Sequence, residues 1–234
     1  MSKNALISRR LTVLLLWPLG VGLTSWRYMW RTTPMRRVEF EDVCAREGAP
    51  GFPEGLNLDE LLLPEEGVGP HFHRRYRVRI KKARVRAGDV MASIQSDPNI
   101  VSPTEFARFR KVGTVTDSMV LGDEWVIHMP GPWNGPVRVV DVTPNSFRFV
   151  TLKGHLEAGQ IEFRARDDVD LIFEIESWAR SADVLSHFMY DSLRMAKEIQ
   201  LHMWTSTLER VVRLSKGVRH GPISIETRRS ELDG

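Results

Sequence analysis

The chain has 234 residues, of which 42% are hydrophobic and 27% are charged, values typical of a globular protein with a buried core. Cys44 is the only cysteine, which excludes an intrachain disulfide. The net charge of +3 hides opposite blocks, because residues 1–37 and 71–86 contain Lys and Arg but no acid, whereas residues 38–66 are strongly acidic. The remainder is acidic and no partner stripe of exposed aromatic residues accompanies the basic run of residues 74–86, so we expect no nucleic-acid partner.

Residues 1–37 form a basic and apolar N-terminal segment. Residues 11–26 carry no charge, but this run is shorter than the roughly 18–20 residues of a membrane-spanning helix. Trp17, Trp26 and Trp30 are of the type that favours the headgroup layer. Three interpretations remain open: a membrane anchor or interfacial helix, which we favour, a segment packed on the domain, and a cleaved signal peptide. The protein is therefore expected to be membrane-associated with a cytoplasmic domain, or cytoplasmic.

Residues 38–70 are predicted to be an acidic linker rich in proline and glycine. The next residues change character, because apolar and basic side chains alternate over residues 76–85. Tyr76, Val78 and Ile80 would face one side of this strand and Arg77 and Arg79 the other.

An antiparallel meander is predicted after this first strand. Residues 87–95 indicate a short helix, ended by Asp97 and Pro98. Turn signals then separate six further strands, over residues 106–115, 124–129, 137–142, 147–152, 160–166 and 169–177. One face of the last three strands would be apolar. Its opposite face would carry a cross-strand ladder of charges exposed to solvent, formed by Arg148, Glu162, Arg164, Glu174 and Glu176.

The spacing of apolar residues changes to three and four over residues 183–215, which predicts one long helix. Asp183 would cap it, and Gly217 would follow its end. Because a long apolar helix stripe and an apolar sheet face must cover each other, we expect an α+β fold. In this fold a curved antiparallel sheet of six to seven strands wraps around the C-terminal helix, within a domain of residues 71–217, and residues 218–234 are a tail.

Four short stretches point to a known family, namely residues 67–70, 129–133, 154–159 and 177–181. The third reads Gly-His-x-Glu-x-Gly. Together they resemble the uncharacterised domain-of-unknown-function family 1990 of bacteria and plants, over roughly residues 67–215. The order of elements resembles the helix-grip architecture of the START and Bet v 1-like superfamily. This resemblance implies a cavity between sheet and helix that holds apolar small molecules in relatives, and it implies no catalytic residue and no cofactor.

Several polar or aromatic residues are candidates for a ligand site at the mouth of such a cavity. His155 and Glu157 could act as acid and base or bind a polar group, although a turn built for its backbone is the more favoured interpretation. Arg180 could hold a carboxylate or phosphate, or form a salt bridge to a neighbouring glutamate. Trp133 could cover the cavity, but a loop anchor is favoured.

The remaining candidates would line the cavity from the sheet and the helix. They are Phe147, Phe149, Phe163, Phe173, Trp178, Met189 and Met203. The large rings could instead fill the interior. His71 and His73 share one face of a strand, but no third ligand accompanies them, so we expect no metal.

The function expected from these patterns is the binding of an apolar small molecule or lipid in the cavity. An enzyme such as a cyclase, hydrolase or isomerase in the same cavity is one alternative, and an interaction domain with a filled core is another. A cavity above about 300 Å³ would favour the first two. No catalytic signature stands out, which favours binding over catalysis. The basic run of residues 74–86 either packs its stems on the domain or attracts an anionic membrane surface.

The membrane anchor leads to a first prediction. Deletion of residues 1–37 should move the protein from the membrane fraction to the soluble fraction of a lysate, because the apolar segment would be its main attachment. Fractionation with immunodetection measures this distribution. An unchanged distribution would contradict the anchor.

Overall fold

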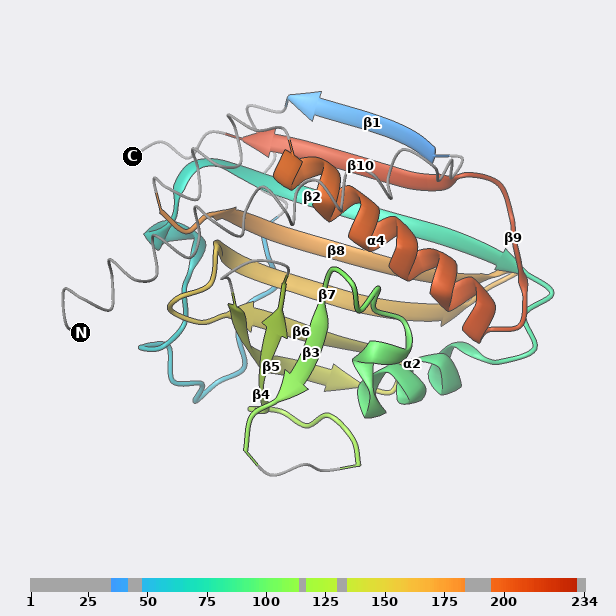
Figure 1. The fold of residues 1–234 in the computed structure, drawn as a ribbon, viewed down its shortest axis with the longest axis horizontal. Helices are drawn as coiled ribbons and strands as arrows, with labels where there is room; N and C mark the ends of the chain where they lie inside the picture. Colours follow the sequence, from blue (N-terminus) through green and yellow to red (C-terminus); the bar gives the residue numbers. More distant parts are fainter. Residues whose placement is uncertain (1–34, 42–47, 114–116, 130–133, 184–194, 231–234) are drawn as a thin grey trace.

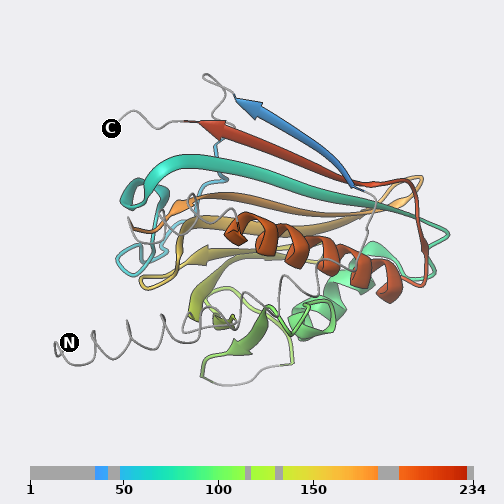
Figure 2. The same cartoon turned by 45° about the horizontal axis from the view of Figure 1, so that its top comes forward.

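A computed structural model of the protein describes residues 35–41, 48–113, 117–129, 134–183 and 195–230 (Figure 1). Within these ranges the chain forms one large curved sheet and two α-helices, with α4 crossing the concave face of the sheet (Figures 1 and 2). The helical elements are η1 (Pro64–Glu66), α2 (Ala87–Ser96), η2 (Pro98–Ile100) and α4 (Met195–Leu214). The strands are β1 (Met35–Glu41), β2 (Val68–Lys81), β3 (Arg108–Lys111), β4 (Glu124–His128), β5 (Asn134–Thr143), β6 (Ser146–Thr151), β7 (Glu157–Asp167), β8 (Leu171–Ser181), β9 (Val218–Arg219) and β10 (Ile223–Ser230).

The strand order is β1-β10-β2-β8-β7-β6-β5-β4-β3, and β9 pairs with β2 beside this path. Neighbouring strands are antiparallel, with the exception of β1, which runs parallel to β10. The predicted α+β class and antiparallel meander are therefore confirmed. The predicted number of six to seven strands is wrong, since the described residues contain ten. The additional strands, β1, β9 and β10, come from the two ends of the chain.

The residues predicted to be a C-terminal tail contribute to the core. In β10, Ile223 and Ile225 are 0% and 2% exposed, and the strand pairs with β2 from Ser224 to Ser230. The alternation of Ile223 and Ile225 with Ser224 and Glu226 is the same half-buried pattern that predicts the other strands. This tail is a strand because it covers an edge of β2 that would otherwise leave its backbone groups unpaired.

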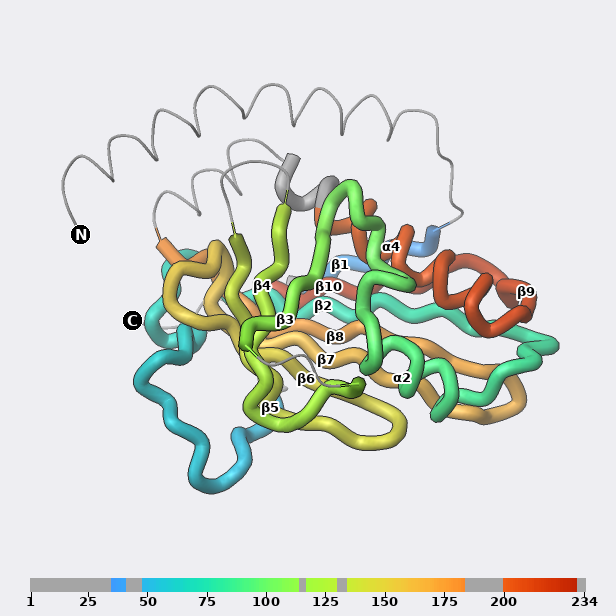
Figure 3. The backbone as a smooth tube through the Cα atoms, turned by 60° about the horizontal axis from the view of Figure 1, so that its bottom comes forward, coloured from blue at the N-terminus to red at the C-terminus, as the bar shows by residue number. Residues whose placement is uncertain are grey.

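The predicted linker packs on the convex face of the sheet. Leu61 is fully buried against Val140 and Val150, and the backbone N–H of Leu62 donates to the carbonyl of Thr151 over 2.8 Å. Phe52 packs on the same cluster. Residues 48–66 thus form a second small core on the side of the sheet away from α4 (Figure 3).

The predicted C-terminal helix is confirmed for its second half. Leu201, Trp204, Leu208 and Val211 of α4 are buried in the core, at the spacing expected of one helix face. α2 adds a second patch of apolar side chains to the same core. Residues 184–194 lie outside the described residues, so the predicted start of the helix stays a prediction.

Most of the predicted N-terminal segment also lies outside the described residues. In the ranges that the structure describes, no helix is both long and apolar enough to cross a membrane. Met35, Arg36 and Arg37 belong to β1. A truncation that tests the anchor should therefore stop at residue 34, so that the sheet keeps its edge strand.

Ending the chain after Gly217 should destabilise the protein by about 3 kcal/mol or more, because the buried side chains of Ile223 and Ile225 are lost with β10. Urea unfolding followed by circular dichroism measures this change. A control chain that ends after Ser230 keeps β10 and should unfold like the full chain. Equal stability of both truncations would show that β10 is dispensable.

Candidate functional site

The pleat of β2 sends alternate side chains to opposite faces of the sheet. Tyr76, Val78 and Ile80 join the core under α4, as the sequence predicts. By the same alternation, Phe72 and Arg74 point to the concave side, whereas His73, Arg75 and Arg77 point to the convex side. One strand therefore contributes to two different environments.

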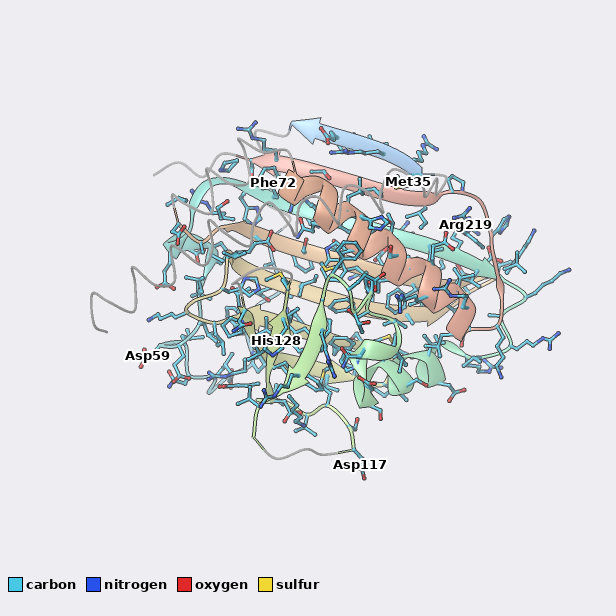
Figure 4. All side chains as sticks on the ribbon, in the orientation of Figure 1. Met35, Asp59, Phe72, Asp117, His128 and Arg219 are labelled. Carbon is cyan, nitrogen blue, oxygen red and sulfur yellow. The ribbon has the colours of Figure 1, made fainter. Side chains whose placement is uncertain are left out.

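Arg74 is a buried charge on the concave side, with only 5% of its surface exposed. Its Nη1 donates to Gln200 Oε1 over 2.9 Å and lies 4.0 Å from Glu157 Oε1. Gln200 Nε2 lies 3.3 Å from the same carboxylate oxygen. The guanidinium carbon stands 4.4 Å from the centre of the Phe72 ring. These contacts join β2, β7 and α4 at the N-terminal end of the described part of α4, where Phe72 is labelled in Figure 4.

A pocket of about 110 Å³ opens beside this cluster, between α4 and strands β1, β10 and β2. We call it the Arg74 pocket. Its lining residues are Arg37, Glu39, Phe40, Phe72, Arg74, Tyr76, Gln200, Leu201, Ile225, Thr227 and Arg229.

The pKa of Tyr76 depends on burial and on the charges around the pocket. Burial raises the pKa of its hydroxyl above the ordinary value, and the nearby charge of Glu157 acts in the same direction. The charges of Arg74 and Arg37 oppose this shift. The hydroxyl is therefore protonated near neutral pH and can donate a hydrogen bond.

The predicted aromatic lining residues lie on the concave side of β6, β7 and β8, within the core. The rings of Phe147 and Phe163 stack with centres 4.8 Å apart, and Phe147 meets Phe149 edge-on at 5.3 Å. Phe163 meets Trp204 of α4 at 5.6 Å. Phe173 is fully buried in the same core. None of these residues lines the Arg74 pocket.

The turn at residues 154–159 is organised around its backbone. The backbone N–H of Glu157 donates to Nδ1 of His155 over 2.9 Å. Nδ1 also lies 3.0 Å from the carbonyl oxygen of Glu157, so the ring meets both main-chain groups of Glu157: it accepts from the N–H when Nδ1 is unprotonated and donates to the carbonyl when Nδ1 is protonated. A Cβ on Gly135 would lie 2.8 Å from Nε2 of His155, and a Cβ on Gly159 would lie 2.0 Å from the carbonyl oxygen of Trp178. The absence of a side chain at Gly135 leaves room for the His155 imidazole, and its absence at Gly159 leaves room for the backbone of the neighbouring strand β8.

His155 and Glu157 are close in the turn, but their side chains have different partners. The His155 ring is held by the main chain of Glu157, while the Glu157 carboxylate interacts with Gln200 and Arg74. Burial lowers the pKa of His155 below 6.5, although the charge of Glu157 and its backbone contact oppose this shift. The structure therefore brings Glu157, but not the His155 ring, to the Arg74 cluster.

Trp178 and Arg180 lie on the convex side of β8. The Trp178 indole stacks on His73 with ring centres 5.3 Å apart. Nε of Arg180 donates to the carbonyl of Gly69 over 2.7 Å, and its Nη1 lies 3.4 Å from the carbonyl of Pro64. Arg180 thus ties the first residues of β2 to η1.

The predicted charge ladder exists, but its carboxylates are not exposed to solvent. Glu174 and Glu176 are each 2% exposed. Arg77 and Arg164 contact Glu174, and Arg75 and Arg164 contact Glu176. The prediction of a solvated face was wrong because the arginine side chains from the neighbouring strands cover the shorter glutamates.

Burial by itself would raise the pKa of Glu176. Hydrogen bonds from His73 and Arg75, together with the charge of Arg164, outweigh burial and lower this pKa to about 2. The carboxylate therefore contributes stability that is complete above its ordinary pKa of 4.5 and is lost as the pH falls towards 2. Stability of the convex face thus depends on an ionised Glu176.

Two predicted site residues, Trp133 and Met189, lie outside the described residues. Met203 is half-buried and packs on the core. Sequence reasoning missed Arg74, Tyr76 and Gln200 as site residues. A signal for Arg74 was present, because the alternation that puts Tyr76 inside also puts Arg74 inside.

The fold and pocket define an α+β protein in which a curved, mostly antiparallel sheet holds a helix and a small cationic pocket on its concave side. A family model matches residues 69–210, and its description is "Domain of unknown function (DUF1990)". The chain belongs to this family, as the resemblance of its sequence motifs predicts.

Solved structures of similar shape share little sequence with the chain. Hypothetical protein jhp0584 from Helicobacter pylori has 10% identity and a TM-score of 0.47, over 74% of this chain and 99% of that chain. A norcoclaurine synthase point mutant from Thalictrum flavum has 8% identity and a TM-score of 0.46, over 64% of this chain and 97% of that chain. A search of curated proteins found no match.

The turn leads to a prediction about pH. Because the pKa of His155 is lowered by folding, the unfolded chain binds more protons below pH 6.5, so the stability of the folded protein should fall as the pH drops from 7 to 5. His155→Asn keeps an acceptor for the Glu157 N–H but does not titrate, and it should reduce this loss. Denaturant unfolding at several pH values compares the two proteins. An NMR titration midpoint of His155 at or above 6.5 would refute the proposed cause.

Proposed function

We propose that this protein binds an apolar small molecule, or the apolar part of a lipid, between α4 and the concave face of the sheet. One observation carries the proposal: five apolar or aromatic side chains from three strands and a helix line the Arg74 pocket, together with six polar or charged ones. The apolar wall consists of Phe40, Phe72, Tyr76, Leu201 and Ile225. In small-molecule sites the burial of apolar surface supplies affinity and polar groups set orientation, and this wall offers the first contribution.

The size of the pocket limits the ligand. Its volume of about 110 Å³ does not reach the roughly 300 Å³ that would favour binding or catalysis over a filled core, so the proposal is restricted to a small ligand. An apolar cavity of about 150 Å³ holds one benzene molecule. The Arg74 pocket is smaller than this, so it suits a short chain or part of one ring, and any larger ligand would extend through its mouth.

Binding is supported over catalysis by the surroundings of the polar candidates. The His155 imidazole contacts the main chain of its own turn, and Arg180 donates to the carbonyls of Gly69 in β2 and Pro64 in η1. Arg74 and Gln200 line the pocket, and both contact Glu157, which lies outside the lining. These groups can orient a polar part of a ligand by hydrogen bonds.

Membrane association remains a prediction from residues 1–34. If these residues attach to a bilayer, the protein would sample ligands that partition into the membrane. We therefore keep a lipid as one possible source of the apolar ligand.

Native mass spectrometry of the full chain tests the proposal. The full chain is required because β1 and β10 line the pocket. We expect a co-purifying apolar compound, and NMR titration with benzyl alcohol should shift signals of Leu201 and Ile225. Thr227→Trp should block both effects, since Thr227 lines the pocket.

Ser224→Trp is the matched control, because this residue lies on the same strand but outside the pocket lining. It should bind like the wild type. Absence of any bound compound, together with benzyl alcohol shifts that do not map to the pocket, would refute the proposal.

A further inference from the structure

The Arg74 pocket is cationic as well as apolar. Arg37, Arg74 and Arg229 line it, whereas Glu39 is the one acidic residue of the lining. Resting on the proposed function, we propose that the pocket selects small carboxylic acids, aromatic or short-chain, with Arg74 as the counter-ion of the ligand carboxylate.

The three arginines lie at different depths. The side chain of Arg74 is 7% exposed, whereas that of Arg37 is 43% exposed and Arg229 is also exposed at the rim. A charge in a poorly hydrated site attracts an opposite charge more strongly than one at the surface. Arg37, which is ion-paired with Glu39, and Arg229 would therefore attract an anion to the mouth, and Arg74 would hold it inside.

Geometry favours a planar acidic group. The guanidinium of Arg74 stands 4.4 Å from the Phe72 ring centre, and its Nη1 is bonded to Gln200. The hydrogen bond to Gln200 and the contact with the Phe72 ring restrict the orientation of the guanidinium. A guanidinium presents N–H groups as a fork that matches the two oxygens of a carboxylate.

The size of the ligand charge follows from the described residues. Among these, three arginines line the pocket, against Glu39 of the lining and Glu157, which lies 4.0 Å from Arg74. A carboxylate adds one negative charge to this set and a phosphate monoester adds nearly two, so we expect the carboxylate to fit better. The protonated hydroxyl of Tyr76 supplies a further donor at the pocket wall.

The Glu157 carboxylate already makes a contact with Arg74 like the one that a ligand carboxylate would make. This carboxylate lies near Arg74 and accepts from Gln200. A bound acid would therefore compete with Glu157 for Arg74. Because of this competition, Arg74→Gln should weaken the binding of an acid and Glu157→Gln should strengthen it.

The experiment compares benzoate, benzyl alcohol and phenyl phosphate as probes of the full chain, by calorimetry and NMR. We expect benzoate to bind at least about tenfold more tightly than benzyl alcohol, as for a charge-assisted contact worth about 1.4 kcal/mol. Phenyl phosphate should bind more weakly than benzoate. Rising salt should weaken benzoate binding and leave benzyl alcohol binding almost unchanged.

Substitutions then assign the preference to residues. Arg74→Gln should abolish the preference for benzoate and preserve benzyl alcohol binding, whereas Glu157→Gln should tighten benzoate binding several-fold. Arg79→Gln is the matched control on β2, since Arg79 pairs with Asp170 outside the pocket, and it should change neither affinity. If Arg74→Gln does not fold, Arg37→Gln at the rim, with Arg36→Gln as its control, should lower benzoate affinity about threefold.

The outcomes separate this inference from the proposed function. Equal affinity for benzoate and benzyl alcohol would overturn the acid preference but leave apolar binding intact. Tighter binding of phenyl phosphate would overturn the carboxylate assignment. Unchanged benzoate affinity in Arg74→Gln or in Arg37→Gln would overturn the role of these arginines, and failure of both benzyl alcohol and benzoate to bind would refute the proposed function itself.

Discussion

The alternation of side chains along β2 is the constraint on which the rest of the structure depends. Because successive residues of a strand face opposite sides of a sheet, one strand must satisfy two environments at once. Its even-numbered residues from Phe72 to Ile80 meet α4 and the core, and its odd-numbered residues from His73 to Arg77 meet the carboxylates of β8. A shift of one residue in register would place Arg75 and Arg77 in the core and Val78 outside. The register of β2 is therefore strongly specified.

The convex face shows how a central region of the sheet tolerates buried charges. Glu174 and Glu176 are almost completely buried, yet each contacts guanidinium groups from both neighbouring strands. Removing one partner from such a buried set typically costs about 3–5 kcal/mol, because the remaining charge loses its compensation. The intact network therefore adds little net free energy of folding, but the loss of one of its groups would destabilise the contact of β2, β8 and β7.

The candidate site occurs where β1 and β10, the first and last described strands, pair with each other. β1 and β10 extend the sheet beyond β2, and α4 crosses the concave side next to them (Figures 1 and 2). The aromatic cluster of Phe147, Phe149 and Phe163 lies on other strands and packs on Trp204. One part of the interior thus supports the fold, and another part offers space and charge to a ligand.

The sequence by itself determined the α+β class, the meander, the second half of the predicted C-terminal helix, which is α4, and the family, because each depends on local periodicity or on a contiguous motif. It also placed Phe147, Phe149, Phe163 and Phe173 on one face of the sheet. Only the tertiary structure decided that residues 48–66 cover the convex face and that β10 pairs with β2, since both depend on contacts between distant parts of the chain. The pocket was also decided only by the tertiary structure. Its residues Arg37, Arg74, Gln200 and Arg229 become neighbours only when β1, β2, α4 and β10 assemble.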